Sequence, residues 1–121
     1  MRSKTSSETR RAQKESLLRK ELSKIFLDVK LNDPSFESIF INRVRLSPDK
    51  GTVHVFFYTD KGEQFFKEKF PLLVLYKPSI RKALSQLVSS RYTPQIIFKF
   101  DKAFEKQRGI EQLLDKIKEE E

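Results

Sequence analysis

The chain has 121 residues, which is enough for one hydrophobic core and leaves little room for a second. It contains no cysteine and one histidine, so disulfides and thiolate metal sites are excluded and a zinc site is not expected. With 25 Lys and Arg against 17 Asp and Glu, the net charge is +8, which favours a polyanionic partner. A basic surface that serves only solvation is the alternative.

The charge is unevenly distributed. Residues 1–30 hold nine basic and four acidic side chains, residues 31–100 hold eleven and six, and residues 101–121 hold five and seven. No segment has the apolar core of a secretory signal, and the most apolar run, residues 70–76, is too short to cross a bilayer. We therefore expect a cytoplasmic protein without membrane association, basic in its body and slightly acidic at its C-terminal end.

The first segment predicts a long amphipathic helix. Thr5 and Glu8 have the spacing of a capping box, in which two side chains satisfy free amides of the first turn. The helix is expected to end before Asp33-Pro34, because proline restricts the preceding residue and cannot extend the hydrogen-bond ladder. Five apolar residues recur at helical spacing and should face the core: Leu18, Leu22, Ile25, Phe26 and Val29.

Two strands joined by a tight turn are predicted next. The first lies within residues 38–47, and the second, residues 52–59, is rich in β-branched and aromatic side chains. In the turn, Pro48 presets its dihedral angle and Gly51 is expected to take a positive φ. The alternation in the first strand places two arginines, Arg43 and Arg45, on one face and three apolar residues on the buried face: Phe40, Val44 and Leu46.

Residues 62–90 predict a helical region that is broken. Pro71 argues against a continuous first half. Pro78 must kink the path or occupy the first turn of a new helix, where its missing amide is harmless. After Pro78 an apolar face recurs at helical spacing until Ser89-Ser90 ends the element: Ile80, Ala83, Leu84, Leu87 and Val88.

A third strand and a final helix complete the chain. The strand spans residues 95–101, with Ile96, Phe98 and Phe100 on one face. The helix has Gly109 near its start and an apolar stripe of Ile110, Leu113, Leu114 and Ile117. The order α-β-β-α-kink-α-β-α predicts an α+β domain whose helices cover the apolar face of a three-stranded sheet. We expect one domain over residues 1–121, with a core of about 8–117 and frayed termini.

The sequence offers little for catalysis. The three glycines are scattered, so no glycine-rich phosphate loop is present, and no serine lies in a G-x-S-x-G context. His54 lies within a predicted strand, where a structural role is favoured. No metal or cofactor is expected, and the chain is predicted not to be an enzyme. An acylphosphatase-like activity is disfavoured because it needs an anion-binding loop with Arg and Gly.

Basic side chains remain as the candidates for function, since they can bind RNA phosphates and Arg can do so with two parallel hydrogen bonds. The phenylalanines could stack on bases as in RNP-type sheets, but most fall on faces predicted to be buried, which favours packing. The sequence does not show whether the cations converge on one face. The candidates are Arg10, Arg11, Lys14, Arg43, Arg45, Lys77, Arg81, Lys82 and Arg91.

Several strings resemble the ribosome-binding factor A family over roughly Thr9 to Ile117. The order of elements is that of a KH-like domain of the second type. The RYTP string before a strand that ends in FxFD is the most specific match. In chain order the strings are TRRAQKESLLRKELSKIF, RVRLSPDKGTVHVFF, IRKALSQLVSSRYTPQIIFKFD and IEQLLDKI.

The resemblance implies a cytoplasmic assembly factor that binds the immature small (30S) ribosomal subunit and its 16S rRNA, with other assembly factors as further partners. Nothing in the sequence suggests an obligate dimer, so a monomer is expected. Such a factor supports rRNA maturation and end processing, matters most at low temperature, and holds RNA in one conformation without bond chemistry. Arg81, Lys82 and Arg91 best match the family's basic residues, followed by Arg10 and Arg45.

Two positions depart from the family's pattern. At the kink the family carries Ala-x-Gly, whereas this chain has Tyr76-Lys77-Pro78, which removes the close approach of an RNA backbone to a glycine. The Arg that often follows the Asp-Pro pair is Ser35 here. The alternative function is a protein-interaction module whose basic surface binds acidic partners without RNA, and whose sheet edge could accept another strand.

Overall fold

The elements follow the order that the sequence pattern predicted, with one short 3-10 helix in addition. The structure, a computed structural model, describes residues 6–87 and 93–120. The predicted cap at Thr5 and the predicted helix end at Ser89-Ser90 lie outside these residues. The elements are α1 (Ser6–Asn32), η1 (Pro34–Phe36), β1 (Phe40–Leu46), β2 (Thr52–Tyr58), α2 (Glu63–Leu75), α3 (Lys77–Leu87), β3 (Gln95–Phe100) and α4 (Lys102–Glu120).

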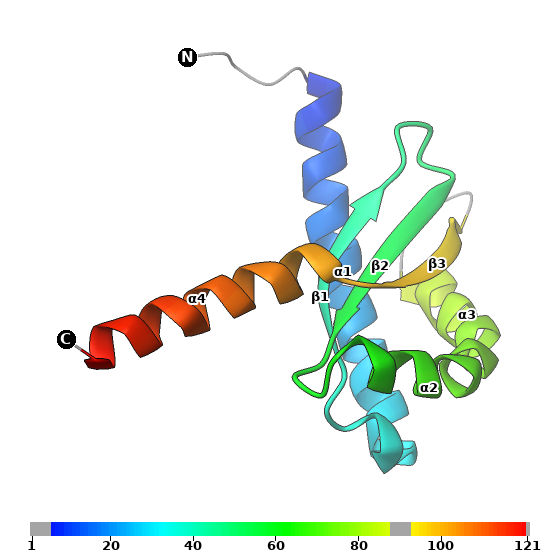
Figure 1. Cartoon of the computed structure of the whole chain (residues 1–121). Coiled ribbons are helices and arrows are strands. Elements are labelled where there is room, and N and C mark those ends of the chain that lie inside the picture. The colour runs from blue at the N-terminus through cyan, green and yellow to red at the C-terminus, as the bar shows by residue number, and fades with distance from the viewer. Residues whose placement is uncertain (1–5, 88–92, 121) are drawn as a thin grey trace.

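The three strands form one mixed sheet in the order β1-β2-β3, with β1 antiparallel and β3 parallel to β2. α1 packs along β1, while α2 and α3 pack on the β3 side, so the helices cover one face of the sheet (Figure 1). The five apolar residues predicted to line α1 are all buried. Alternate strand residues meet them from the sheet: Val44, Leu46, Val53, Val55, Phe57, Ile96, Phe98 and Phe100.

A β-bulge corrects the predicted alternation in β1. Ile41 pairs with Phe57 and Arg43 pairs with Phe56, so Asn42 is an extra residue without a partner on β2. An extra residue reverses the alternation, so side chains before the bulge lie on the opposite face from that expected by counting back from Leu46 and Val44. Phe40 was predicted to be buried with Val44 and Leu46, but it is 40% exposed. The prediction for Phe40 was wrong because a strict period of two cannot pass through a bulge.

The turn between β1 and β2 also differs from the prediction. Lys50, and not Gly51, takes the left-handed conformation, with φ 62°. The Asp49 carboxylate accepts hydrogen bonds from the Ser47 hydroxyl at 2.6 Å and from the Gly51 amide at 2.9 Å. The side chain of Asp49 therefore closes the turn, and the backbone of Gly51 does not need a positive φ.

The helical region after β2 consists of two helices that meet at Tyr76. α2 continues through Pro71, contrary to the expected interruption, because Phe66 and Leu73 anchor it in the core on either side and Pro71 itself is exposed. Pro78 lies in the first turn of α3, where no amide is needed. The Tyr76 ring packs edge-on against Phe36 and its hydroxyl donates to Asp33 at 3.3 Å, which fixes the junction.

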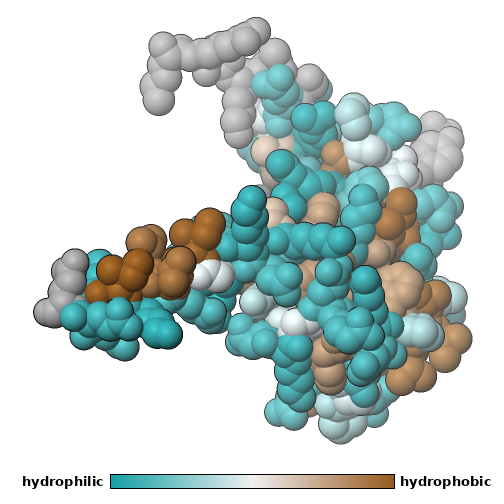
Figure 2. Space-filling model, viewed as in Figure 1, coloured by the Kyte–Doolittle hydropathy of each residue, from teal (hydrophilic) through white to brown (hydrophobic). Residues whose placement is uncertain are grey.

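α4 extends away from the sheet. Its first turns are held by the Phe104 ring, 4.7 Å from that of Tyr58, and by an ion pair between Arg108 and Asp60 at 3.0 Å. The helix continues past Gly109 to Glu120, with no buried residue, and its apolar stripe is exposed (Figures 1 and 2). The expected covering of the sheet by helices therefore holds for α1, α2 and α3 but not for α4.

None of the helices within residues 6–87 and 93–120 has both the length and the apolar character needed to cross a membrane.

Phe57 is expected to contribute strongly to stability, since it is 1% exposed and its ring lies 5.1–5.8 Å from those of Phe26, Phe66 and Phe98. Phe57→Ala should lower the free energy of unfolding by about 3–5 kcal/mol, because a cavity replaces a buried ring. Leu114→Ala, in the exposed stripe of α4, should change it by less than about 0.5 kcal/mol. Urea denaturation followed by circular dichroism measures both, and equal losses would contradict this packing.

Candidate nucleic-acid interface

The predicted cations are spread over three elements and do not form one cluster. Arg91 lies outside the described residues, so the structure does not place it. The others fall into an α1 group (Arg10, Arg11 and Lys14), a β1 pair (Arg43 and Arg45) and an α3 group (Lys77, Arg81 and Lys82). α1 and α3 pack against each other on the core side of the sheet, whereas the β1 pair lies on the opposite face.

In the α3 group, Arg81 has a structural role. Its guanidinium donates to the carbonyl oxygens of Thr93 at 2.9 Å and Pro94 at 3.2 Å, which fixes the backbone that leads into β3. The Lys77 ammonium lies 5.1 Å from the ring centroid of Phe98. Lys82 is exposed and, with Arg81, borders an open hollow of about 300 Å³ beside Thr93. Lys82 is therefore the most exposed cation of this group.

In the α1 group, Arg10 is exposed, while Arg11 and Lys14 are half-buried. The next residue, Glu15, accepts a hydrogen bond from the Leu46 amide at 2.7 Å. This bond ties the turn of α1 that carries Arg11 and Lys14 to the end of β1.

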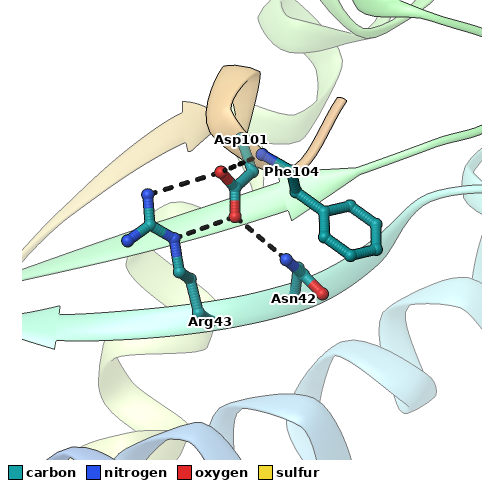
Figure 3. A network of polar contacts seen from close by, with 4 residues as sticks. All are labelled: Asn42, Arg43, Asp101 and Phe104. Carbon is teal, nitrogen blue, oxygen red and sulfur yellow. Dashed lines mark hydrogen bonds and ion pairs between the residues drawn. The ribbon is translucent and has the colours of Figure 1, made fainter. Parts of the chain in front are cut away.

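The β1 pair projects from the face of the sheet opposite the core. Arg43 donates from Nε and Nη2 to the two carboxylate oxygens of Asp101, at 2.9 and 3.3 Å (Figure 3). Asn42 donates to the same carboxylate at 2.9 Å, as does the Phe104 amide at 3.1 Å. The bulge explains why two consecutive residues of one strand reach the same acceptor. Arg45 is exposed and pairs across the sheet with His54.

Asp101 is ionised although its side chain is only 1% exposed. Burial disfavours the charged form and alone would raise its pKa. The hydrogen bonds from Arg43, Asn42 and the Phe104 amide outweigh burial, so the pKa of Asp101 lies below its ordinary value of 3.8. A single buried carboxylate thus fixes the Arg43 guanidinium and caps the first turn of α4.

Two residues beside Arg43 were not predicted as part of the site. Phe56 lies under Arg43, with the guanidinium carbon 4.1 Å from the ring centroid, and the Lys99 ammonium is 5.9 Å from the same ring. Phe56 is half-buried on the face opposite the core, unlike Phe57 and Phe98. The alternation of both strands indicates this face, but the cross-strand register that joins Phe56 to Lys99 is not visible in the sequence.

Within the described part of the chain, no group of three or more His, Asp or Glu side chains is arranged to hold a metal ion. The site therefore consists of cations, one aromatic ring and the carboxylate that orients Arg43.

The mixed three-stranded sheet, with α1, α2 and α3 on one face and cations on the other, defines a KH-like α+β domain with a basic surface. The family model of ribosome-binding factor A matches residues 10–114, so the chain belongs to the ribosome-binding factor A family. This is a family of ribosome-binding factors and not of enzymes. The predicted fold class and the predicted family are both confirmed.

Relatives support this assignment along most of the chain. A ribosome-binding factor A from Halothermothrix orenii is 36% identical over 105 residues, which cover 87% of this chain and 85% of that one. The crystal structure of ribosome-binding factor A from Thermus thermophilus superimposes with a TM-score of 0.64 at 22% identity, covering 74% of this chain and 93% of that one. The NMR structure of a Thermotoga maritima protein, a putative ribosome binding factor A, superimposes with a TM-score of 0.65 at 26% identity. The match covers 74% of this chain and 84% of that one.

The Asp101 network predicts a specific dependence of stability on pH. Because the folded-state pKa is depressed, the carboxylate stabilises the fold above the unfolded pKa, and this contribution is lost as the pH falls through the folded pKa. Asp101→Asn should lower the free energy of unfolding by about 1–3 kcal/mol at neutral pH. The difference from the parent protein should shrink between about pH 5 and pH 2.

Urea denaturation at a series of pH values measures this effect. Asp115→Asn, at an exposed carboxylate of α4, is the matched control and should leave stability nearly unchanged. A constant difference between Asp101→Asn and the parent at all pH values would contradict the ionised state of Asp101.

Proposed function

We propose that the protein binds the immature small (30S) ribosomal subunit through its 16S rRNA and supports maturation of that rRNA. It acts in the cytoplasm as a monomer, alongside other assembly factors, and its contribution is greatest at low temperature. It holds RNA in one conformation and catalyses no reaction. Membership of the ribosome-binding factor A family is the observation that carries this proposal.

The distribution of charge supports contact with RNA. Exposed or partly exposed cations lie on α1, β1 and α3, while residues 101–121 carry more acids than bases. A cation that binds phosphate must be accessible from solvent, and its side chain should not be needed to hold the fold together. Arg10, Arg45 and Lys82 meet this condition best because all three are exposed. We propose Arg11, Lys14, Lys77 and Arg91 as secondary contacts, and Arg43 and Arg81 as residues that also hold the structure.

Cosedimentation tests the proposal directly. When a cell extract is centrifuged through a sucrose gradient, the protein should travel with small subunits, and RNase treatment should release it. A protein that stays at the top of the gradient, or that remains bound to an acidic protein after RNase treatment, would contradict rRNA binding.

Salt dependence should identify the cations that contact phosphate. Arg10→Gln, Arg45→Gln and Lys82→Gln combined should weaken binding to purified small subunits and reduce the slope of log affinity against log salt, by about 0.7–0.9 for each phosphate that is no longer neutralised. Arg81 is left in place because its replacement would release the backbone at Thr93 and Pro94.

The control removes the same charge from α4 through Lys106→Gln, Lys116→Gln and Lys118→Gln, all at exposed positions. Binding of both variants to purified small subunits is measured between about 50 and 200 mM salt. If both variants lose affinity equally, the binding depends on net charge and not on these three residues.

A further inference from the structure

The face of the sheet that the helices leave uncovered has a definite chemical pattern. The pairing of β1 with β2 and of β2 with β3 aligns the outward side chains of this face in two rows across the strands. The first row is Arg43, Phe56 and Lys99, and the second is Arg45, His54 and Ile97. Viewed from this side, the surface over the sheet is mainly hydrophilic (Figure 2). Three of these six residues are cations and none is acidic, so the face complements a polyanion.

Arg43 is preorganised as a flat stacking surface. Two of its nitrogens are hydrogen-bonded to Asp101, whose side chain is 1% exposed, and its guanidinium carbon lies 4.1 Å from the centroid of the Phe56 ring. The Arg43 side chain is nevertheless 40% exposed. A guanidinium that is held by a carboxylate and an aromatic ring has lost most of its freedom before any ligand binds, which lowers the entropic cost of binding.

The flanking residues suit an RNA strand whose bases are unpaired. Bases that are not paired stack on aromatic rings and on Arg guanidinium planes, and cations beside such a platform follow the phosphates. Lys99 and Arg45 are both exposed and lie on either side of the central strand, while Ile97, 39% exposed, offers an apolar contact. A double helix would present phosphates but no free base face.

We propose that this open sheet face binds unpaired RNA, with one base stacked on the Arg43 guanidinium and neighbouring phosphates bound by Arg45 and Lys99. The inference rests on the proposed function, since it assigns one part of the rRNA contact and states that this part is single-stranded. Asp101 and Phe56 are positioning residues, because they hold Arg43 without touching the base.

The experiment compares two RNA strands of equal charge. One is an oligoadenylate of about ten nucleotides, and the other has the same length but lacks bases in its central part. The full chain should bind the first at least about fivefold more tightly, which is the lower end of the effect of stacking one base. Fluorescence anisotropy measures both affinities. Equal affinities would overturn the proposal, as would tighter binding of a blunt RNA duplex.

Variants that keep the charge test the platform itself. Arg43→Lys retains the positive charge but removes the planar guanidinium. Phe56→Leu removes the aromatic ring while leaving the ion pair between Arg43 and Asp101 in place. Both should remove most of the preference for the strand with bases, while Arg19→Lys, at an exposed position of α1, should keep it. If Arg43→Lys does not fold, Phe56→Leu carries the test. A preference that survives Phe56→Leu in a folded protein would overturn the proposal.

Two further measurements separate the possible outcomes. Cosedimentation with small subunits, done with the same preparations, tests the proposed function independently. Subunit binding without a preference for the strand with bases would overturn only the sheet-face proposal. A preference for that strand without subunit binding would overturn only the proposed function. Analytical ultracentrifugation tests for a second copy on this face. A dimer that Ile97→Glu dissociates would mean that the face is a protein interface, and the proposal would fall.

Discussion

The buried carboxylate of Asp101 connects parts of the fold that are distant in the sequence. It follows β3, accepts hydrogen bonds from Asn42 and Arg43 on β1, and accepts another from the Phe104 amide at the start of α4. β1 and β3 are the two edges of the sheet and do not pair with each other. Asp101 therefore links both edges across the central strand, and it also caps the first turn of α4.

A buried charge of this kind is tolerated only when its hydrogen bonds compensate for lost hydration. The bulge at Asn42 supplies the additional donor, since a regular strand would turn Asn42 to the other face. The same bulge exposes Phe40. One irregularity in β1 thus supplies a further donor to the carboxylate and turns Phe40 away from the core.

Sequence periodicity predicted the elements well, because each helix and strand carries an apolar face of the correct period. It could not reveal features that depend on register or on contacts between distant residues. The bulge, the left-handed Lys50 and the pairing of Phe56 with Lys99 are of this kind. The apolar stripe of α4 predicted packing, yet the stripe begins at Ile110, beyond the contacts of Phe104 and Arg108 that hold the helix. The nine cations were identifiable by type, but the structural roles of Arg43 and Arg81 were not.

The small size of the domain explains why one face of the sheet can remain open for binding. A chain of 121 residues supports one core, and the helices α1, α2 and α3 already use the apolar side chains of the sheet to build it. Antiparallel and mixed sheets of this kind can expose their second face if its side chains are polar. Here that face carries cations that would repel one another if they were all free, and Asp101 offsets part of this repulsion at Arg43. The structural ion pair therefore also serves the proposed binding surface: the carboxylate compensates one of its three cations and holds Arg43 in place.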